Sequence, residues 1–432
     1  MMRRLEVWVD FGVAEDGSTR PARQVGTLAE SGTLTAFEFA PSLLQAPLPL
    51  SPLQLPARPG LFTCDDPDLD RLPGVFADCL PDGFGRLVQD RAFELRGVPR
   101  ARITALDRLA ALGEGGMGAL VFRPASNIWP SADAESSLDL SALAAQGERL
   151  LEGSAEDVLP ELLTNGGSSA GARPKVLAGV AEDGRVVAGV ADGGRLPNGF
   201  APWLIKFAAQ EDVRSFGRDA GAVEFAYWAM ARRAGVTVPD ARLFDDGQGG
   251  RWFGSARFDR HGREGAGRRH LHTLGGLLHA SHRVPSLDYT AYLAVTMRLT
   301  RDMREVEQSV RRMIFNVRMH NRDDHVRNFA FLLQADGAWR QAPAYDLTFS
   351  AGMQGHHSMA IGGETRRPTR AGMLGLAERA GVSRRRAEEI YDEIDDVVAM
   401  WRSVAEDVGI DMSVVRRIEA ALAEVRREAG QS

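Results

Sequence analysis

The chain has 432 residues, too many for one ordinary hydrophobic core, so we expect two or three domains. Hydrophobic residues make up 44% and charged residues 25%, which is typical of a globular protein and excludes a disordered chain, a collagen and a small disulfide scaffold. The formal net charge of −6 excludes a polycation that binds nucleic acid over its whole surface, so any contact with DNA must come from a local patch or a partner.

The two cysteines, Cys64 and Cys79, provide neither a metal cluster nor a disulfide framework, which is typical of the reducing cytosol. No stretch reaches the ~20 apolar residues of a membrane helix. An alternating segment at 5–10 stands where a signal peptide would have its apolar core. We therefore expect a cytoplasmic, soluble protein with no membrane partner.

Residues 1–125 are expected to form a small mixed domain. Alternating polarity predicts strands near 5–10 and 34–39. The six prolines of 41–60 predict an extended surface segment without a helix.

Two helices and a linker are predicted after this segment. The turn signal Pro81-Asp82-Gly83 opens a helix that runs through Phe93, and a second short helix covers 103–112. Residues 124–155 are rich in Ala, Ser and Asp, which predicts a linker to the rest of the chain.

A β-rich part and then a helical part follow. The predicted strands are 175–177, 186–188, 203–207 and 252–253, and a helix near 216–234 interrupts them. From about 270, apolar residues recur at intervals of three and four, which predicts helices within 290–319, 371–380, 384–407 and 412–428. We expect an α+β fold of two lobes with a cleft, divided into 1–125, 126–260 and 261–432.

Lysine is almost absent from the chain, because Lys175 and Lys206 are the only two. A lysine kept amid so strong an arginine bias marks a place where a compact ammonium is needed rather than a planar guanidinium. The alternative is chance survival, which loses weight because both lysines lie inside motifs.

The segment Arg322-Asp323-Asp324-His325-Val326-Arg327-Asn328 has the most specific spacing. An Asp followed five residues later by an Asn is the spacing of a kinase catalytic loop, in which Asp accepts the hydroxyl proton and Asn holds a metal ion. Asp346 lies eighteen residues beyond Asn328, where a second metal-binding carboxylate would return after a strand. The alternative is a polar turn followed by a solvated aspartate.

Lys206 lies in the apolar run Trp203-Leu204-Ile205-Lys206-Phe207, and a lone charge among hydrophobic residues must be paired or directed into a cleft. Kinases place a strand lysine on the ATP phosphates and pair it with a helix glutamate, for which Glu224 on the next helix is the candidate. The alternative is an edge-strand lysine that reaches solvent.

A glycine-rich loop covers 165–175, and such a loop lets backbone N–H groups approach a phosphate closely. It matches neither the Walker A pattern nor the Gly-x-Gly-x-x-Gly pattern of protein kinases, so by itself it is also compatible with a flexible linker.

Three other polar groups have less specific patterns. His320 and His325 with Asp323 and Asp324 are compatible with a zinc or di-metal hydrolase, which leaves Lys206 unexplained. The histidines expected to be structural or at the surface are His270, His272, His279 and His282. The run Arg384-Arg385-Arg386 after Ser383 is expected to be the solvated first turn of a capped helix, rather than a contact to DNA phosphates.

These motifs together resemble the HipA family of toxin kinases. The matching segments in the second part of the chain are Ser168-Ser169-Ala170-Gly171-Ala172-Arg173-Pro174-Lys175, Trp203–Lys206, Arg257-Phe258-Asp259-Arg260, Asp323–Asn328 and Tyr345-Asp346. The first part agrees through Leu80-Pro81-Asp82-Gly83-Phe84-Gly85-Arg86 and Gly115-Gly116-Met117-Gly118-Ala119-Leu120. The resemblance spans nearly the whole chain, in the family's order.

The resemblance implies a serine/threonine protein kinase with a divergent, lipid-kinase-like fold that uses ATP and Mg²⁺. It implies that Asp323 is the catalytic base and that Asn328 and Asp346 hold Mg²⁺. The residues implied to contact the nucleotide are Ala170, Gly171, Ala172, Arg173, Lys175, Lys206 with its partner Glu224, Arg257, Phe258, His325 and Tyr345. Ser168 matches the serine that family members autophosphorylate, which ejects the loop and switches the enzyme off.

The chain departs from the family at three places. An alanine precedes Arg257 where glutamate is frequent, and Arg173-Pro174 replaces Gln-Glu or Gln-Pro. Asp324 stands where glycine is common. It either raises the pKa of Asp323 by like-charge repulsion or faces solvent beside Arg322 and Arg327, and we expect the second.

Family members with known targets modify aminoacyl-tRNA synthetases. The resemblance therefore implies a toxin that phosphorylates a serine of a translation protein and arrests growth, a state linked to persistence. It also implies a small helix-turn-helix antitoxin, similar to HipB, that neutralises the toxin and mediates its contact with operator DNA. The alternative is a weakly active or inactive co-repressor that mainly docks this antitoxin, against which the intact set of candidate catalytic residues argues.

Overall fold

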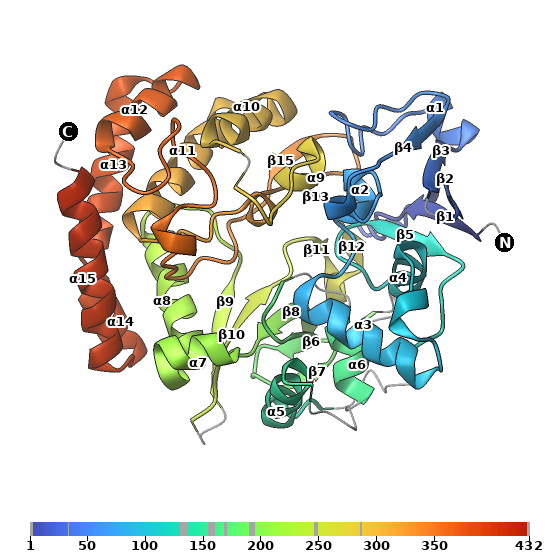
Figure 1. Ribbon diagram of the computed structural model, residues 1–432, viewed down its shortest axis with the longest axis horizontal. Helices are drawn as coiled ribbons and strands as arrows, with labels where there is room; N and C mark the ends of the chain where they lie inside the picture. The colour runs from blue at the N-terminus through green and yellow to red at the C-terminus, as the bar shows by residue number, and fades with distance from the viewer. Residues whose placement is uncertain are drawn as a thin grey trace.

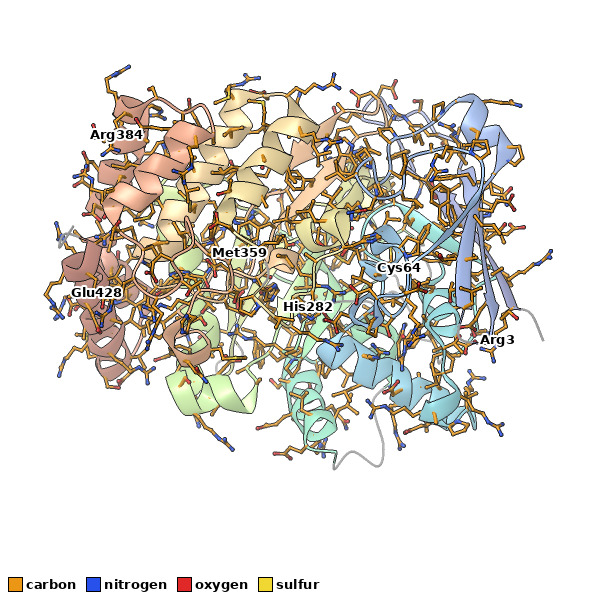
Figure 2. The ribbon with its side chains drawn as sticks, turned by 45° about the horizontal axis from the view of Figure 1, so that its top comes forward. Arg3, Cys64, His282, Met359, Arg384 and Glu428 are labelled. Atoms are coloured by element: carbon orange, nitrogen blue, oxygen red, sulfur yellow. The ribbon has the colours of Figure 1, made fainter. Side chains whose placement is uncertain are left out.

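The computed structural model of the protein describes residues 3–32, 34–129, 137–153, 160–167, 171–189, 195–245, 249–285 and 287–429 (Figure 1). The N-terminal sheet lies at one end of the molecule, the last helices lie at the opposite end, and a second sheet lies between them (Figure 1). Figure 2 shows Arg3 at the first end, Arg384 and Glu428 at the second, and His282 near the middle. Within the described residues, no helix is both long and apolar enough to cross a lipid bilayer.

A five-stranded antiparallel sheet, ordered β4-β3-β2-β1-β5, forms the N-terminal part. Its strands are β1 (Arg3–Val9), β2 (Arg23–Ser31), β3 (Leu34–Phe39), β4 (Leu61–Thr63) and β5 (Leu120–Arg123). Both predicted strands are confirmed. The short helix α1 (Pro41–Gln45) contradicts the prediction of no helix in 41–60, because Pro41 occupies the first turn, where a missing N–H leaves no bond unmade.

Helices connect this sheet to the rest of the chain: α2 (Gly74–Ala77), α3 (Gly83–Leu95), α4 (Ala105–Leu112), α5 (Leu140–Leu151) and α6 (Pro160–Gly166), with the 3₁₀ turns η1 (Pro67–Leu69) and η2 (Arg100–Arg102). The helices predicted from Gly83 and over 103–112 are confirmed as α3 and α4. Helix α5 contradicts the prediction of a linker over 124–155. Asp139 caps it by accepting a bond from Ala142 N–H at 3.0 Å, and Leu143 is buried.

The second sheet is also antiparallel and has the order β7-β6-β8-β10-β9. Its strands are β6 (Lys175–Ala181), β7 (Val186–Ala188), β8 (Phe200–Lys206), β9 (Ala241–Asp245) and β10 (Arg251–Ala256). Phe84, Val88 and Phe93 of α3 share one hydrophobic cluster with Val176 and Ile205 of this sheet. The first part of the chain therefore packs directly on the small lobe.

Two helices of the small lobe and a 3₁₀ turn lie between β8 and β9 in the chain: α7 (Gln210–Phe216), η3 (Gly217–Asp219) and α8 (Ala220–Arg233). After β10 the chain continues through β11 (Arg260–His261), η4 (Arg263–Gly265), β12 (Gly267–Arg268), β13 (His270–Thr273) and α9 (Leu274–Leu278). Strands β11 and β12 form a two-stranded sheet, and β13 pairs with β14 in a three-stranded sheet of order β13-β14-β15. The helix predicted over 216–234 is present as α8, and η3 separates it from α7.

The large lobe contains α10 (Tyr289–Thr300), α11 (Met303–Arg318), η5 (Val326–Asn328), β14 (Ala330–Leu333), β15 (Trp339–Gln341), η6 (Met353–Gly355), α12 (Arg370–Arg379), α13 (Arg384–Val398), α14 (Trp401–Val408) and α15 (Met412–Ala429). Two predicted helices are each divided in two. The first is interrupted by Arg301, whose φ of 53° is left-handed, and Asp302 then caps α11 by accepting from Arg304 N–H at 3.0 Å.

A buried network of hydrogen bonds joins the N-terminal part to β13, the strand that pairs with β14 of the large lobe. His272 of β13 bonds Asp78 through Nδ1 at 2.6 Å and Ser51 through Nε2 at 2.9 Å. Serine hydrolases use the same order of groups, but Ser51 is only 1% exposed, so no substrate reaches it. His270 bonds the Leu50 carbonyl at 2.9 Å, which confirms that these histidines are structural.

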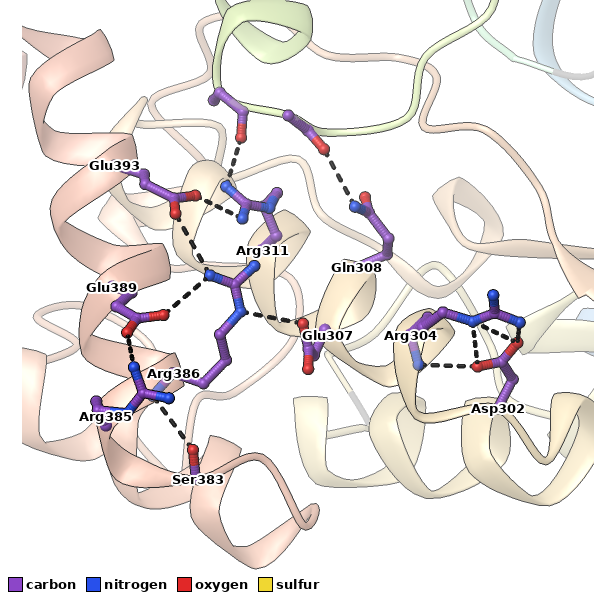
Figure 3. A network of polar contacts seen from close by, with 12 residues as sticks. Asp302, Arg304, Glu307, Gln308, Arg311, Ser383, Arg385, Arg386, Glu389 and Glu393 are labelled. Carbon is purple, nitrogen blue, oxygen red and sulfur yellow. Dashed lines mark hydrogen bonds and ion pairs between the residues drawn. The ribbon is translucent and has the colours of Figure 1, made fainter.

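The arginine run at the start of α13 is neutralised within the protein. Ser383 caps the helix as predicted by accepting a bond from Arg386 N–H. The guanidinium of Arg386 pairs with Glu307 of α11 at 3.1 Å and with Glu389 at 3.2 Å, and Arg385 pairs with Glu389 at 2.5 Å (Figure 3). The Arg386–Glu307 pair links α11 to α13, and the other two pairs lie within α13.

Candidate active site

The ammonium of Lys206 joins the two lobes. It lies 2.5 Å from Glu224 Oε1 of α8 and pairs with the carboxylate of Asp346, which follows β15. Burial lowers the pKa of a lysine, but Asp346 and Glu224 outweigh burial and raise the pKa of Lys206. The predicted Lys206–Glu224 pair is present, and Asp346 is its third member.

Lys175 lies beside Lys206. The two residues are opposite each other in the β6–β8 ladder, so both of the chain's lysines lie at one point of the cleft. Burial lowers the pKa of Lys175 to about 8. Gly171 has a φ of +110°, and a Cβ there would lie 2.2 Å from Lys175 Nζ. The glycine thus lets the loop backbone close over the ammonium.

Residues of the N-terminal part contact the glycine-rich loop at Gly171 and Ala172. The Asp82 carboxylate accepts a bond from Gly171 N–H and pairs with Arg327 of the catalytic loop. Phe84 N–H donates to the Gly171 carbonyl at 3.1 Å. At Gly83, whose φ is +45°, a Cβ would lie 2.7 Å from Ala172 Cα. The predicted helix start at Asp82 is present, but its carboxylate makes no cap bond and binds the loop instead.

The candidate base, Asp323, lies on the loop between α11 and η5 with its side chain 59% exposed. The cleft walls desolvate its carboxyl and raise its pKa; the charge of His325, at 3.9 Å, opposes this rise and Asp346 adds to it. Asn328 Nδ2 donates to the Asp323 carbonyl at 2.7 Å. This bond fixes the loop and leaves the Asn328 amide oxygen as the group available to a cation.

The expectation that Asp324 faces solvent is wrong. Asp324 is 1% exposed, and its Oδ2 accepts from the Tyr289 hydroxyl at 2.8 Å and from His357 Nδ1 at 2.9 Å. Its Oδ1 accepts from Ser358 N–H at 2.8 Å. Asp324 therefore fastens the catalytic loop to α10 and to the segment after Asp346. Like-charge repulsion from Asp324 is only a minor cause of the raised pKa of Asp323.

Arg257 and Phe258, which follow β10, contact different parts of the chain. The Arg257 guanidinium pairs with Asp259 at 2.7 Å and donates to the Gly116 carbonyl, and Arg257 N–H donates to the Pro202 carbonyl at 2.9 Å. The Arg257 side chain and N–H thus bond to neighbouring segments, and a contact of this residue with a nucleotide stays a prediction. Phe258 stacks on Tyr345, with ring centroids 5.5 Å apart.

Predicted residues from both sides of the cleft, among them Lys175, Lys206, Glu224 and Asp346, thus come together. Ser168 and Ala170 lie outside the described residues, so neither prediction is tested. Sequence reasoning missed the roles of Asp82 and of Asp212, which pairs with Arg173. The Pro81-Asp82-Gly83 signal was visible only as a turn, and Asp212 had no signal.

The donor set fits Mg²⁺ rather than zinc. Asn328 and Asp346 offer an amide oxygen and a carboxylate, which are the hard oxygen ligands that Mg²⁺ prefers, with few protein ligands and several waters. Among the described residues, no three His, Cys, Asp or Glu side chains gather as a metal site. His320 stacks on Phe349 at 4.9 Å. The hydrolase alternative therefore has no support.

Replacing each of the two neighbouring aspartates by asparagine should affect the stability of the protein very differently. Asp324→Asn replaces one acceptor oxygen with a donor among three donors, so we expect the free energy of unfolding to fall by about 2–3 kcal/mol. Asp323→Asn at an exposed carboxyl should change it by less than about 0.5 kcal/mol. Urea denaturation measures both. Equal stability of the two variants would contradict the assignment of Asp324 as the anchor.

Two family models match the chain. Residues 167–401 match the HipA-like C-terminal domain, and residues 20–123 match the HipA N-terminal domain. No curated protein matches the chain in sequence.

One solved structure has the same overall fold as this chain. A complex from Shewanella oneidensis MR-1, described as the toxin–antitoxin system HipA, HipB and its operator DNA, has a chain with a TM-score of 0.69 and 18% identity, over 98% of this chain and 97% of that one. CtkA, described as a proinflammatory kinase of Helicobacter pylori, has a TM-score of 0.38 and 12% identity, over 53% of this chain and 85% of that one. The predicted α+β, two-lobed, kinase-like fold is confirmed, and because the C-terminal model alone covers more than half of the sequence, the chain belongs to the HipA family.

Proposed function

We propose that the protein is a serine/threonine kinase that transfers the γ-phosphoryl group of ATP to a serine hydroxyl of another protein. The observation that carries this proposal is the position of Lys206, held by Glu224 from one lobe and by Asp346 from the other. Protein kinases need this lysine–glutamate pair and a metal-binding aspartate together.

The nucleotide phosphates would bind Lys206 and Lys175 under the loop from Ala170 to Lys175, whose backbone N–H groups suit an anion. The adenine ring of the nucleotide would lie near the stacked rings of Phe258 and Tyr345, which border a small apolar cluster that includes Ala330 and Leu332 of β14. His325 would lie beside the nucleotide, close to the candidate base Asp323, from which its Nε2 is 3.9 Å away.

Asp323 would accept the proton of the substrate hydroxyl, and its raised pKa brings it closer to the working pH of a general base. Asn328 and Asp346 would hold Mg²⁺, which neutralises charge on the phosphates when bound. Asp324 keeps Asp323 in place through its three bonds. The protein's contribution is then mostly positioning and electrostatic stabilisation, as is usual for phosphoryl transfer.

We further propose that the substrate is a translation protein, in keeping with an aminoacyl-tRNA synthetase, and that autophosphorylation at Ser168 inactivates the kinase. A small helix-turn-helix antitoxin would neutralise the protein and link it to operator DNA. The solved complex of HipA with HipB and operator DNA supports this partner, since its HipA chain has the same fold. The neutralised arginines of α13 support a contact with DNA mainly through the antitoxin.

Intact-mass spectrometry after incubation with Mg²⁺-ATP tests the kinase. We expect a gain of one phosphate in the wild type and none in Asp323→Asn or Ser168→Ala, because the first lacks the base and the second lacks the acceptor. Asp336→Asn, in the turn between β14 and β15, should behave as the wild type. A wild type that starts without phosphate, binds Mg²⁺-ATP and still gains no phosphate would contradict the kinase. It would favour the alternative, a co-repressor that mainly docks the antitoxin.

Proton uptake tests the place of Lys175. With a pKa of about 8, part of the amine is neutral in the free protein above that pH, and a neighbouring triphosphate raises the pKa again. Binding of Mg²⁺-ATP should therefore take up protons at about pH 8.5 and almost none at about pH 7, since the phosphates, with a second pKa near ~6, are ionised at both. Calorimetry in buffers of different ionisation enthalpy measures the uptake. Unchanged uptake in Lys175→Met would refute this assignment.

A further inference from the structure

Arg173 connects the phosphate loop to two helices. Its Nη2 lies 2.9 Å from Asp212 Oδ1 of α7, and its Nη1 lies 3.0 Å from Glu224 Oε2 of α8. Both carboxylates are almost fully buried, with side-chain exposures of 11% and 3%, whereas Arg173 is 28% exposed and borders the cleft. One guanidinium thus neutralises two acids from separate elements, with a different nitrogen of its planar fork on each.

Glu224 is shared between two cations. Oε1 binds Lys206 at 2.5 Å while Oε2 binds Arg173, so both carboxylate oxygens are occupied. A buried carboxylate that loses one of two charged partners is left with an unmade bond, which is costly. The orientation of Glu224 toward Lys206 therefore depends on Arg173.

The segment that carries Arg173 is anchored on both sides. Gly171 N–H binds the Asp82 carboxylate, and Phe207 N–H, directly after Lys206, donates to the Pro174 carbonyl at 2.8 Å. If the loop moved away, the guanidinium would leave Asp212 and Glu224 together. The carboxylates of Asp346 and Asp323 are also near enough to help raise the pKa of Arg173, so its charge is balanced by the whole cleft.

We propose that Arg173 is a positioning residue that couples closure of the phosphate loop to the seating of α8, so that the loop is closed only while Glu224 holds Lys206. The proposal rests on the proposed kinase function and adds a device by which this site assembles as one unit.

Hydrogen exchange in the nucleotide-free protein tests the coupling directly. Arg173→Gln should speed amide exchange both in the peptide that covers 171–177 and in the peptide that covers 220–227 of α8. A merely local role would affect only the loop peptide. Asp212→Asn, which keeps the Glu224 contact, should affect the loop more than α8, and Arg173→Lys should restore part of the protection.

Binding provides the second readout. Because the loop would be closed in a smaller fraction of molecules, we expect Arg173→Gln to raise the Kd for Mg²⁺-ATP about tenfold. The matched control is Arg386→Gln, whose 33% exposed side chain also bridges two helices (Figure 3) but contacts none of the candidate site residues. It should lower the melting temperature and leave the Kd unchanged.

The outcomes separate this inference from the function on which it rests. Unchanged exchange in α8 together with an unchanged Kd in Arg173→Gln would overturn the coupling. A wild type that does not bind Mg²⁺-ATP would instead refute the proposed kinase, and the exchange of α8 in the nucleotide-free variant would still decide whether Arg173 couples the two elements.

Discussion

The ion pairs around Lys206 are the interaction on which the rest of the cleft depends. A buried ammonium is stable only when carboxylates compensate it, and here Glu224 comes from the small lobe and Asp346 from the large lobe. The series continues through Arg173 to Asp212, so charges of alternating sign run from Asp212 of α7 to Asp346. The contact between the lobes, the position of the loop and the orientation of the Asp346 carboxylate therefore depend on one electrostatic network.

The N-terminal part is built into this arrangement. Its sheet shares a hydrophobic cluster with the large lobe, and its helix α3 shares another with the small lobe. Two carboxylates of the N-terminal part add polar contacts: Asp78 binds His272, and Asp82 binds Gly171 and Arg327. Asp259 in turn binds Gly118 N–H of the N-terminal part at 2.7 Å. The geometry of the cleft consequently depends on all three parts of the chain.

Sequence reasoning found the site where chemistry restricts residue type and spacing. Two lysines in an arginine-rich chain, and an Asp–Asn spacing of five, identified groups that the fold brings together. It failed where a side chain chooses a partner far along the chain. Asp324 is expected in solvent when only its sequence neighbours are considered. The partners that bury it, Tyr289 and His357, are 35 and 33 residues away along the chain. Local propensity carries no information on such contacts, and the same holds for α5, whose burial depends on packing against α3.

A titration of the protein with Mg²⁺-ATP tests the central claim most directly, because the account rests on Lys206 as the centre of a nucleotide site. The account predicts saturable binding that requires Mg²⁺ and weakens at least about tenfold in Lys206→Ala, as expected when a buried charge–phosphate contact is lost. Binding of equal strength in Lys206→Ala, or no binding to a folded wild type, would contradict it.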